Sequence, residues 1–210
     1  RYPVLLKAVA GGGGRGMRRV FAKEEMTAAF QSASAEASSA FGNGAMYMEK
    51  LITQGRHIEF QVLSDGKSAV VLGERECSIQ RRHQKLLEET PSLLVSDEQR
   101  VQLQDTISRV CVELGYRGAG TIEMLGDADG SLYFIEMNTR LQVEHTITEE
   151  VTRIDLVEHQ LRIAANEPLN VVYKPSGHSI QCRINAEDVT NNFRPQPGRI
   201  STLRWPEMDG

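Results

Sequence analysis

Strand-like runs in this sequence follow one another across short turns rich in glycine and aspartate, instead of alternating with helices. The run from His57 to Leu63 alternates apolar and polar residues, and Asp65-Gly66 supplies a turn before a returning run from Ala69 to Leu72. Residues 118–125 and 131–138 form a second such pair. Neighbouring strands joined by short turns pair in antiparallel fashion. The sequence therefore predicts an α+β fold built on antiparallel sheets.

Helical periodicity predicts three helices, over residues 23–41, 96–115 and 155–165. In the second helix Ser96 and Gln99 fit a capping box, and a glycine follows each of the first two helices as a stop signal. The residues expected to face the core are Leu103, Ile107, Val110, Cys111 and Leu114 in the second helix, and Leu156, Val157, Leu161 and Ala164 in the third. Further strands are expected over residues 2–8, 17–21, 45–51, 179–185 and 199–203.

Composition argues against several classes of protein. The 210-residue chain has a formal net charge of −4, so nothing in it favours nucleic acid or an anionic membrane as a partner. No apolar run is long enough to span a bilayer, and the three cysteines lie far apart without the spacing of a zinc site. We expect an intracellular protein with free thiols, in the cytoplasm or the mitochondrial matrix.

Gly11, Gly13 and Gly16 satisfy the G-x-G-x-x-G pattern of dinucleotide-binding folds. Such a fold needs the last glycine to open a helix, whereas Gly16 opens a strand-like run, and the Gly-Lys-Ser/Thr of a Walker A loop is absent. Two interpretations remain: a mobile surface loop, or a glycine flap whose backbone N–H groups approach phosphate oxygens. Lys7 favours the flap, because a lysine at the end of an apolar strand is costly to bury unless it meets an anion.

Acidic and amide side chains occur on both strands around the second turn. If residues 127–130 form a four-residue hairpin loop, Phe134 lies opposite Glu123, and Glu136 is its diagonal neighbour roughly 7–8 Å away on the same face. Asn138 shares that face. Two carboxylates and an amide oxygen suit a hard cation such as Mg²⁺. The alternative is a pair of solvated glutamates on an exposed sheet.

The segment after this hairpin carries a permanent cation, Arg140, and a carboxylate, Glu144, four residues later. Arg140 could hold a planar anion with two hydrogen bonds, and Glu144 could act as a base. Taken alone, the two residues are equally consistent with a surface salt bridge.

Taken together, these segments resemble biotin carboxylases, which are members of the ATP-grasp superfamily. The matching motifs run in the family's order across nearly the whole chain, and their combination is highly specific. They are Lys7-Ala8, residues 11–17, Met48-Glu49-Lys50, and residues 56–59, 74–85, 115–121, 134–145 and 182–188. One departure is Thr146, where the family usually has proline.

The resemblance implies an ATP-grasp fold with two antiparallel-sheet subdomains, flanking helices and a glycine-rich flap. Residues 1–50 would form part of the small lid subdomain. Residues 51–210 would form the large subdomain and run into the start of the C-terminal biotin carboxylase region. We therefore expect both ends to be cuts in a longer protein, with a nucleotide-fold domain and a further ATP-contacting lysine before Arg1. The arginine that stabilises the biotin enolate is expected after Gly210, and the isolated piece should turn over poorly.

The resemblance also implies a role for individual residues. The nucleotide site would use Lys7, Gly13 and Gly14 at the phosphates, Glu49, Lys50 and Ile52 at the adenine, and His57, Gln80 and His83 around the ribose and phosphates. The metal site for Mg²⁺ or Mn²⁺ would use Glu123, Glu136 and Asn138. The bicarbonate site would use Lys85, Arg140, Gln142 and Val143, with Glu144 taking the proton of bicarbonate.

The reaction implied is the ATP-dependent carboxylation of biotin, on a biotinyl carrier protein, with bicarbonate through carboxyphosphate. The expected partners are the biotinyl carrier, a carboxyltransferase domain or subunit, and a second copy of the full-length protein. The main rival is another carboxyphosphate-forming ATP-grasp ligase, such as a carbamoyl-phosphate synthase. Residues 80–85 and 140–144 match the biotin enzymes better. A second rival is a nucleotide-binding fragment without catalytic activity.

Overall fold

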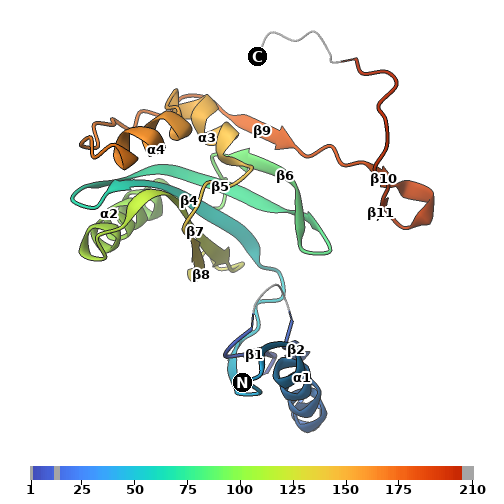
Figure 1. Cartoon of the computed structure of the whole chain (residues 1–210). Helices are drawn as coiled ribbons and strands as arrows, with labels where there is room; N and C mark the ends of the chain where they lie inside the picture. Colours follow the sequence, from blue (N-terminus) through green and yellow to red (C-terminus); the bar gives the residue numbers. More distant parts are fainter. Residues whose placement is uncertain (1, 12–14, 205–210) are drawn as a thin grey trace. The chain divides into compact units, whose positions relative to one another are not determined.

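The structure is a computed structural model that describes residues 2–11 and 15–204 (Figure 1). The chain divides into two compact units. The first unit comprises Arg1–Gly55 with Asp127–Ser131, and the second comprises Arg56–Gly126 with Leu132–Gly210. The division falls five residues after the predicted boundary at residue 50, and the turn at Asp127–Ser131 groups with the first unit. The assignment of these units as lid and large subdomain stays a prediction.

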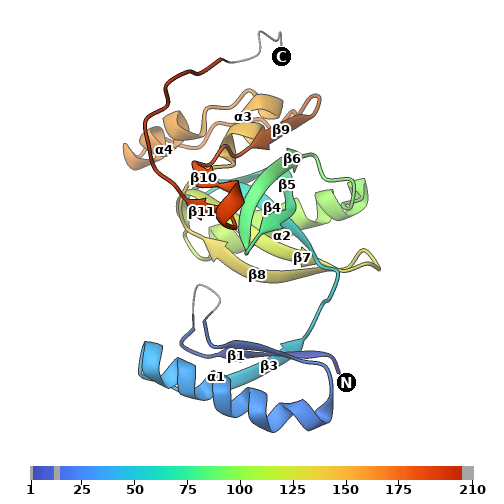
Figure 2. The same cartoon turned by 90° about the vertical axis from the view of Figure 1, so that its right-hand side faces the viewer.

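The first unit is a three-stranded antiparallel sheet in the order β2-β1-β3, with one helix on a face (Figure 2). Its elements are β1 (Val4–Ala8), β2 (Met17–Val20), the short 3-10 helix η1 (Lys23–Glu25), α1 (Met26–Phe41) and β3 (Met46–Lys50). Val4, Leu6 and Val20 form the core under α1. Gly42 ends α1 with a left-handed φ of 72°, as its place after the helical pattern predicted.

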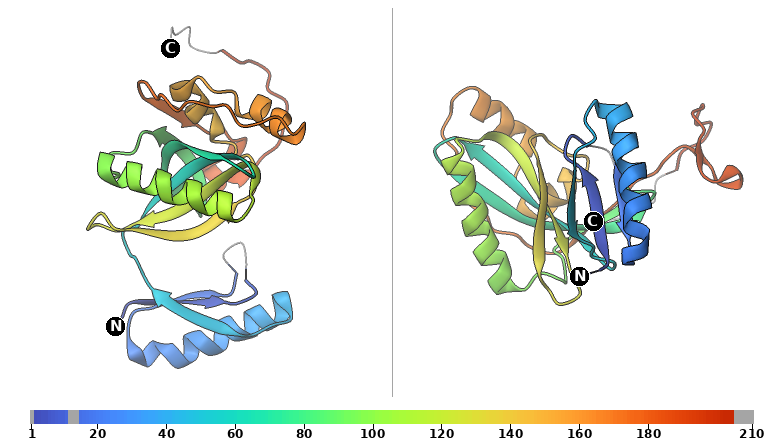
Figure 3. Two further views of the ribbon diagram at one scale, coloured as in Figure 1. Left: turned by 90° about the vertical axis from the view of Figure 1, so that its left-hand side faces the viewer. Right: turned by 90° about the horizontal axis from the view of Figure 1, so that it is seen from below.

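The second unit is a six-stranded antiparallel sheet in the order β8-β7-β4-β5-β6-β9. Its strands are β4 (Arg56–Asp65), β5 (Ala69–Arg81), β6 (Gln84–Thr90), β7 (Arg117–Gly126), β8 (Leu132–Asn138) and β9 (Ser179–Cys182). Strand β8, yellow in Figure 3, forms one edge of this sheet. A small hairpin follows the sheet: β10 (Glu187–Asp188), η2 (Val189–Asn191) and β11 (Arg194–Pro195). The predicted α+β class with antiparallel sheets is confirmed.

Helices cover both faces of this second sheet (Figure 1). Helix α2 (Asp97–Glu113) packs on one face, while α3 (His145–Thr152) and α4 (Leu156–Ala164) pack on the other. The capping box of α2 is confirmed, because Ser96 Oγ accepts from Gln99 N and Gln99 Oε1 accepts from Ser96 N. None of the described helices has the length and apolar character needed to cross a membrane.

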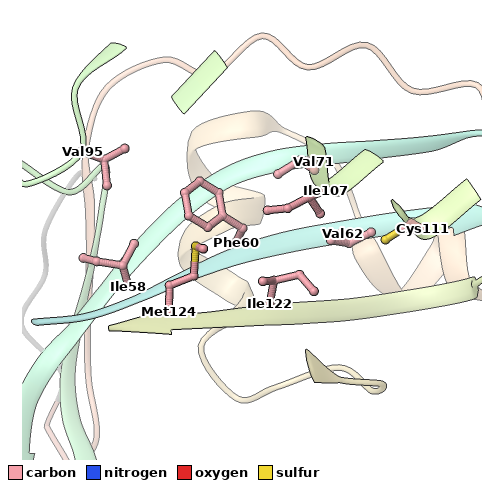
Figure 4. Packing of buried hydrophobic residues seen from close by; sticks show 9 residues of the cluster. All are labelled: Ile58, Phe60, Val62, Val71, Val95, Ile107, Cys111, Ile122 and Met124. Atoms are coloured by element: carbon pink, nitrogen blue, oxygen red, sulfur yellow. The ribbon is translucent and has the colours of Figure 1, made fainter. Parts of the chain in front are cut away.

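The central strand β4 is buried on both faces, and the two faces differ in chemistry. Ile58, Phe60 and Val62 point into the apolar core beneath α2 (Figure 4). Glu59 and Gln61, on the other face, are also fully buried. The period of two along this strand is thus confirmed, but its polar face meets protein instead of solvent.

Several predicted details are wrong. Helix α3 was not predicted, and residues 199–203 form no strand, because they pair with no other strand in the described part of the chain. Strand β9 ends at Cys182 instead of Asn185. The inward faces of two helices also differ from the predicted ones. Helix α2 packs through Ile107 and Cys111, and α4 packs through Leu156 and Ile163. The residues predicted to be inward but found exposed are Val110, Leu114, Val157, Leu161 and Ala164.

Candidate functional site

A cavity of about 380 Å³ in the second unit brings together the candidate residues that lie in that unit. The turn between β5 and β6, the ends of β4, β7 and β8, and the segment before α3 supply its lining. The candidates that line it are His57, Gln80, His83, Lys85, Glu123, Glu136, Asn138, Arg140, Gln142, Val143 and Glu144. Gln84 and Arg183, which were not predicted as site residues, line it too.

The acidic pair of the β7–β8 hairpin lies closer together than predicted. Gly126 pairs with Leu132, and a bulge after Glu123 shifts the register by a further residue, so that Glu136 lies directly opposite Glu123. The predicted diagonal arrangement, with Phe134 opposite Glu123, is therefore wrong, because Phe134 pairs with Met124. The shared face is confirmed, since directly opposed residues point the same way. Glu123 is buried and Glu136 is exposed.

Glu123 is the most heavily contacted carboxylate of this pair. Its Oε1 accepts hydrogen bonds from Asn138 Nδ2 (3.0 Å) and Gln142 Nε2 (3.0 Å), and Lys85 Nζ lies 3.3 Å away. Burial alone would raise the pKa of Glu123, but His57 and Lys85 outweigh burial and lower this pKa to about 2. Glu123 is therefore an anion at neutral pH.

His57 has a defined tautomer. Gln80 Nε2 donates to Cys77 O (2.7 Å) and lies 3.1 Å from His57 Nδ1, so His57 Nδ1 acts as the acceptor. The proton of a neutral His57 is then on Nε2, which lies 3.2 Å from Glu123 Oε2. His57, Glu59 and Glu123 are close enough to hold a metal ion together. His57 Nε2 makes no hydrogen bond to a described residue, although Glu123 Oε2 lies 3.2 Å away.

Lys85 lies among three carboxylates. Its Nζ is 2.5 Å from Glu59 Oε2, 2.5 Å from Glu144 Oε1 and 3.3 Å from Glu123 Oε1. Burial alone would lower the pKa of Lys85, but Glu59 and the other surrounding acids raise it above its usual range. Lys85 is thus a fixed cation in the floor of the cavity.

Glu144 is buried and contacts a different cation with each oxygen. Oε1 accepts from Lys85 Nζ, and Oε2 accepts from Arg183 Nη2 at 2.8 Å. Arg183 in turn donates from Nε to Glu88 Oε1 at 2.6 Å. Burial raises the pKa of Glu88, whose Oε2 has no hydrogen-bond partner among the described residues. The candidate base therefore sits between two positive charges.

The segment from Thr139 to Glu144 begins with exposed side chains and places Gln142 and Glu144 in buried positions. Arg140 is exposed, and its Nη2 donates to Asn138 Oδ1 (3.3 Å). Gln142 is buried, and its Oε1 has no hydrogen-bond partner among the described residues. Val143 is exposed. Arg140 is therefore free of any carboxylate partner in the described part of the chain, which leaves its guanidinium available to an anion.

Glu123, Glu136 and Asn138 fit a divalent cation on chemical grounds. The directly opposed carboxylates of Glu123 and Glu136 repel each other, and a hard cation with oxygen ligands would remove that repulsion. The unpaired Oε1 of Gln142 adds a buried acceptor in the same cavity. This donor set of carboxylate and amide oxygens is typical of Mg²⁺ or Mn²⁺ sites.

The remaining candidates lie in the first unit. Lys7 Nζ is 3.2 Å from Glu49 Oε1 and 5.4 Å from the centroid of the Tyr47 ring. Burial alone would lower the pKa of Lys7, but Tyr47 and Glu49 outweigh it and raise this pKa. Lys50 Nζ pairs with Asp127 Oδ2 at 2.9 Å. Ile52 is half-buried, and Gly13 and Gly14 lie outside the described residues.

Some residues that build the site were not identified from the sequence. Arg183 and Glu59 lie within the motifs that carry the family resemblance, but neither was given a role. In the predicted alternation from His57 to Leu63, Glu59 points to the same side of the strand as His57. This shared side could have identified Glu59 as a site residue. No local pattern points to Arg75 or Glu88, because their partners are distant in sequence.

Comparison with known proteins identifies relatives of this chain. A family model described as "Carbamoyl-phosphate synthase L chain, ATP binding domain" matches residues 1–172. A biotin carboxylase from Nostoc sp. is 52% identical over 100% of this chain, and a biotin carboxylase from Pseudomonas aeruginosa is 47% identical over 100% of it. This chain spans less than half of each relative, 48% and 47% respectively.

Solved structures show the same fold. The biotin carboxylase domain dimer of the Hydrogenobacter thermophilus 2-oxoglutarate carboxylase, in complex with MgADP, ADP and bicarbonate, matches with a TM-score of 0.90 and 50% identity. A β-γ-ATP complex of the Campylobacter jejuni biotin carboxylase matches with a TM-score of 0.91 and 48% identity. In both cases the match covers 100% of this chain and 47% of the other. The predicted ATP-grasp architecture is confirmed.

Proposed function

Because this chain belongs to the family described as the carbamoyl-phosphate synthase L chain, ATP binding domain, we propose that the protein carboxylates biotin with bicarbonate and MgATP. The observation that carries the proposal is the convergence of the second-unit candidates on one cavity, around Lys85 and Glu144. Biotin carboxylases at about 50% identity over the whole chain support the same reaction.

The cavity would bind bicarbonate through its cations. Lys85, Arg140 and Arg183 place ammonium and guanidinium groups around Glu144, and guanidinium groups match a planar anion with paired hydrogen bonds. The Glu144 carboxylate would accept the proton of bicarbonate as the bicarbonate oxygen attacks the γ-phosphorus of ATP. ADP would leave, with carboxyphosphate as the product of this step.

Glu123, Glu136 and Asn138 would hold the divalent ion, which when bound offsets negative charge on the phosphate oxygens. His57, whose Nε2 lies 3.2 Å from Glu123 Oε2, would line the nucleotide site. Lys7 and the glycine loop with Gly13 and Gly14 would contact the phosphates, while Glu49, Lys50 and Ile52 would contact the adenine. Gln80 and His83 would lie near the ribose, and Gln142 and Val143 near bicarbonate.

Carboxyphosphate would break down to CO₂ and phosphate. The phosphate would take the ureido proton of biotin, and the ureido nitrogen would then form a bond with the carbon of CO₂. We propose Arg183, and not a residue after Gly210, as the arginine that stabilises the biotin enolate. Its guanidinium lies 2.8 Å from Glu144, within the bicarbonate cavity. A cation in that position would meet both the bicarbonate and the acceptor.

The first unit would act as the lid over the nucleotide and the second as the large subdomain. The proposed partners are a biotinyl carrier and a carboxyltransferase component, in agreement with relatives from multi-domain carboxylases such as the Rhizobium etli pyruvate carboxylase. A homodimer of the full-length protein is also proposed. The proposed compartment is the cytoplasm or the mitochondrial matrix, since three free cysteines favour a reducing environment.

Steady-state kinetics on the longer natural protein would test this function. ADP release should depend on bicarbonate and should rise when free biotin is added. ADP release that is independent of both substrates would contradict the proposal. Because the matching family model is described by carbamoyl-phosphate synthase, the rival is a ligase that carboxylates no biotin. Bicarbonate dependence without any transfer of ¹⁴C-bicarbonate to biotin would favour that rival.

A further inference from the structure

Arg75 on β5 is a fully buried arginine that lies beside the cavity without lining it. Its guanidinium makes four hydrogen bonds to side chains from three other elements. They run from Nε to Glu59 Oε1 (2.7 Å), from Nη1 to Gln61 Oε1 (2.7 Å) and Thr148 Oγ1 (2.9 Å), and from Nη2 to Thr121 Oγ1 (3.3 Å). The proposed chemistry uses none of these contacts directly.

Stability alone is a weak reason for such a group. Removing a guanidinium and a carboxylate from water costs several kcal/mol for each ion, and well-packed apolar residues often replace a buried ion pair without loss of stability. Arg75 and Glu59 are both 0% exposed, so they bear this cost in full. A better reason for keeping the pair is that its hydrogen bonds connect it to two residues that line the cavity.

The first branch of the network leads to Lys85. Glu59 uses one oxygen to accept from Arg75 and the other to accept from Lys85 Nζ at 2.5 Å. A carboxylate held at both oxygens cannot turn about its terminal bond. Glu59 therefore transmits the position of the Arg75 guanidinium to the Lys85 ammonium.

The second branch leads to Glu144. Thr148, which accepts from Arg75 Nη1, lies in the first turn of α3, and Glu144 is the N-cap residue of that helix. Arg75 Nη1 also donates to Gln61 Oε1. The Gln61 amide is fixed in turn, because its Nε2 donates to Gly120 O at 3.0 Å. The guanidinium is planar and rigid. The Arg75 guanidinium thus contacts both Glu59, which holds the Lys85 ammonium, and Thr148, which lies in the helix that Glu144 caps.

We propose that Arg75 is a positioning residue that holds Lys85 against Glu144, through Glu59 on one side and Thr148 on the other. The proposal deepens the bicarbonate chemistry argued above and rests on it for its catalytic consequence. Arg75→Lys would keep the positive charge but lose the guanidinium N–H groups that donate to Glu59 and Thr148 at the same time.

Kinetics of bicarbonate-dependent ATP hydrolysis by the longer natural protein tests the catalytic consequence. For Arg75→Lys, kcat/KM for bicarbonate should fall by about 10- to 100-fold, because a displacement of 1 Å at a reacting pair can cost about 100-fold. The KM for ATP should change less than about twofold, since no predicted nucleotide residue in the described part of the chain is a hydrogen-bond partner of Arg75. Thr148→Val, which removes only the α3 branch, should shift kcat/KM for bicarbonate in the same direction, and Thr148→Ser should restore it.

Arg100→Lys is the matched control, because Arg100 pairs with the buried Glu74 away from the cavity. It should leave the KM for bicarbonate unchanged. If Arg75 had a purely structural role, Arg75→Lys and Thr148→Val would lower the unfolding midpoint, while kcat/KM for bicarbonate, measured per folded protein, stayed equal to that of the wild type. That result would overturn the proposal.

Crystal structures of the same variants separate this inference from the proposed function. In Arg75→Lys, or in Thr148→Val if Arg75→Lys does not fold, Lys85 Nζ should move out of hydrogen-bond reach of Glu144. A Lys85–Glu144 contact that persists in the variant would overturn the positioning role. A wild-type protein without bicarbonate-dependent hydrolysis would instead contradict the function, and a displaced Lys85 would then still support the positioning role.

Discussion

Glu144, the residue proposed to take the proton of bicarbonate, is held by two cations. Its side chain is buried, one oxygen contacts Lys85 and the other contacts Arg183. Each Glu144 oxygen accepts one hydrogen bond from a cation and keeps a second lone pair, at which it could take the proton of a bound anion.

Glu144→Gln should lower kcat for bicarbonate-dependent ATP hydrolysis by about 100-fold or more, because general-base catalysis contributes about 10²- to 10⁴-fold. The amide keeps the shape and one acceptor oxygen for Lys85 but cannot take a proton. Steady-state assays with the longer natural protein measure this loss. Glu150→Gln, an exposed residue in the same helix region that pairs with Arg153, is the control and should retain wild-type kcat. An active Glu144→Gln variant would remove Glu144 as the base.

Site residues were predictable from the sequence where the side-chain type and the period of two along a strand pointed to the same site. Glu123, Glu136 and Asn138 were identified from residue type and the period of two, and they do line one cavity. Their register was not predictable, because the bulge after Glu123 depends on contacts of the folded strand. Arg75 was missed because its partners lie 14 to 73 residues away in the sequence.

At the scale of elements, the β4–β5 turn depends on one aspartate. Asp65 Oδ1 accepts from the backbone N–H groups of Lys67 and Ser68, and Oδ2 accepts from Leu169 N at 2.7 Å. The hydrogen bond from Leu169, together with those from the turn, lowers the pKa of Asp65 far below its usual value of 3.8. The turn is thus stabilised by the ionised form.

Asp65→Asn should reduce the free energy of unfolding at pH 7 by about 1.5 kcal/mol, the typical contribution of a hydrogen bond to a charged group. The folded-state pKa is depressed, so this stabilisation is present above pH 3.8 and is lost as the pH falls towards the folded-state pKa. Urea denaturation from pH 7 down to pH 3 should show the difference between wild type and variant shrinking below pH 3.8. Asp105→Asn, on the exposed side of α2, should show no such pH dependence. A difference that stays constant with pH would contradict this account.

The N-terminus of α2 offers a second test at this scale. Ser96→Ala should lower the free energy of unfolding by about 1 kcal/mol, because it leaves the backbone N–H of Gln99 without its acceptor. Ser96→Asp, which keeps an acceptor oxygen at the N-cap, should restore most of this loss in urea denaturation. Equal stability of Ser96→Ala and wild type would show that the cap does not stabilise α2.

Elements were predictable where the pattern was long and regular. The capping box with its amphipathic run predicted α2, and the alternation from His57 predicted β4. Helix α3 was missed because its eight residues, which include Thr146, Thr148 and Thr152, have weak intrinsic helix propensity. It is stabilised by tertiary contacts instead, with Ile147, Thr148, Val151 and Thr152 buried.

At the scale of the whole molecule, the second unit combines two kinds of interior around one sheet. The face beneath α2 is apolar, which suits a rigid core. The opposite face of β4 and β5 carries Glu59, Gln61 and Arg75, and this buried polar layer lies directly behind Lys85 and Glu144. A rigid apolar layer behind a fully hydrogen-bonded polar layer is the arrangement expected of a preorganised site.

We propose that this cavity holds a divalent ion through the β7–β8 hairpin, next to the cations proposed to bind bicarbonate. Anomalous diffraction from crystals of the longer natural protein grown with Mn²⁺ and ADP would locate that ion. We predict an anomalous peak between the carboxylates of Glu123 and Glu136, and its loss in a Glu123→Gln variant. A manganese peak away from both carboxylates, in crystals that show bound ADP, would contradict the account.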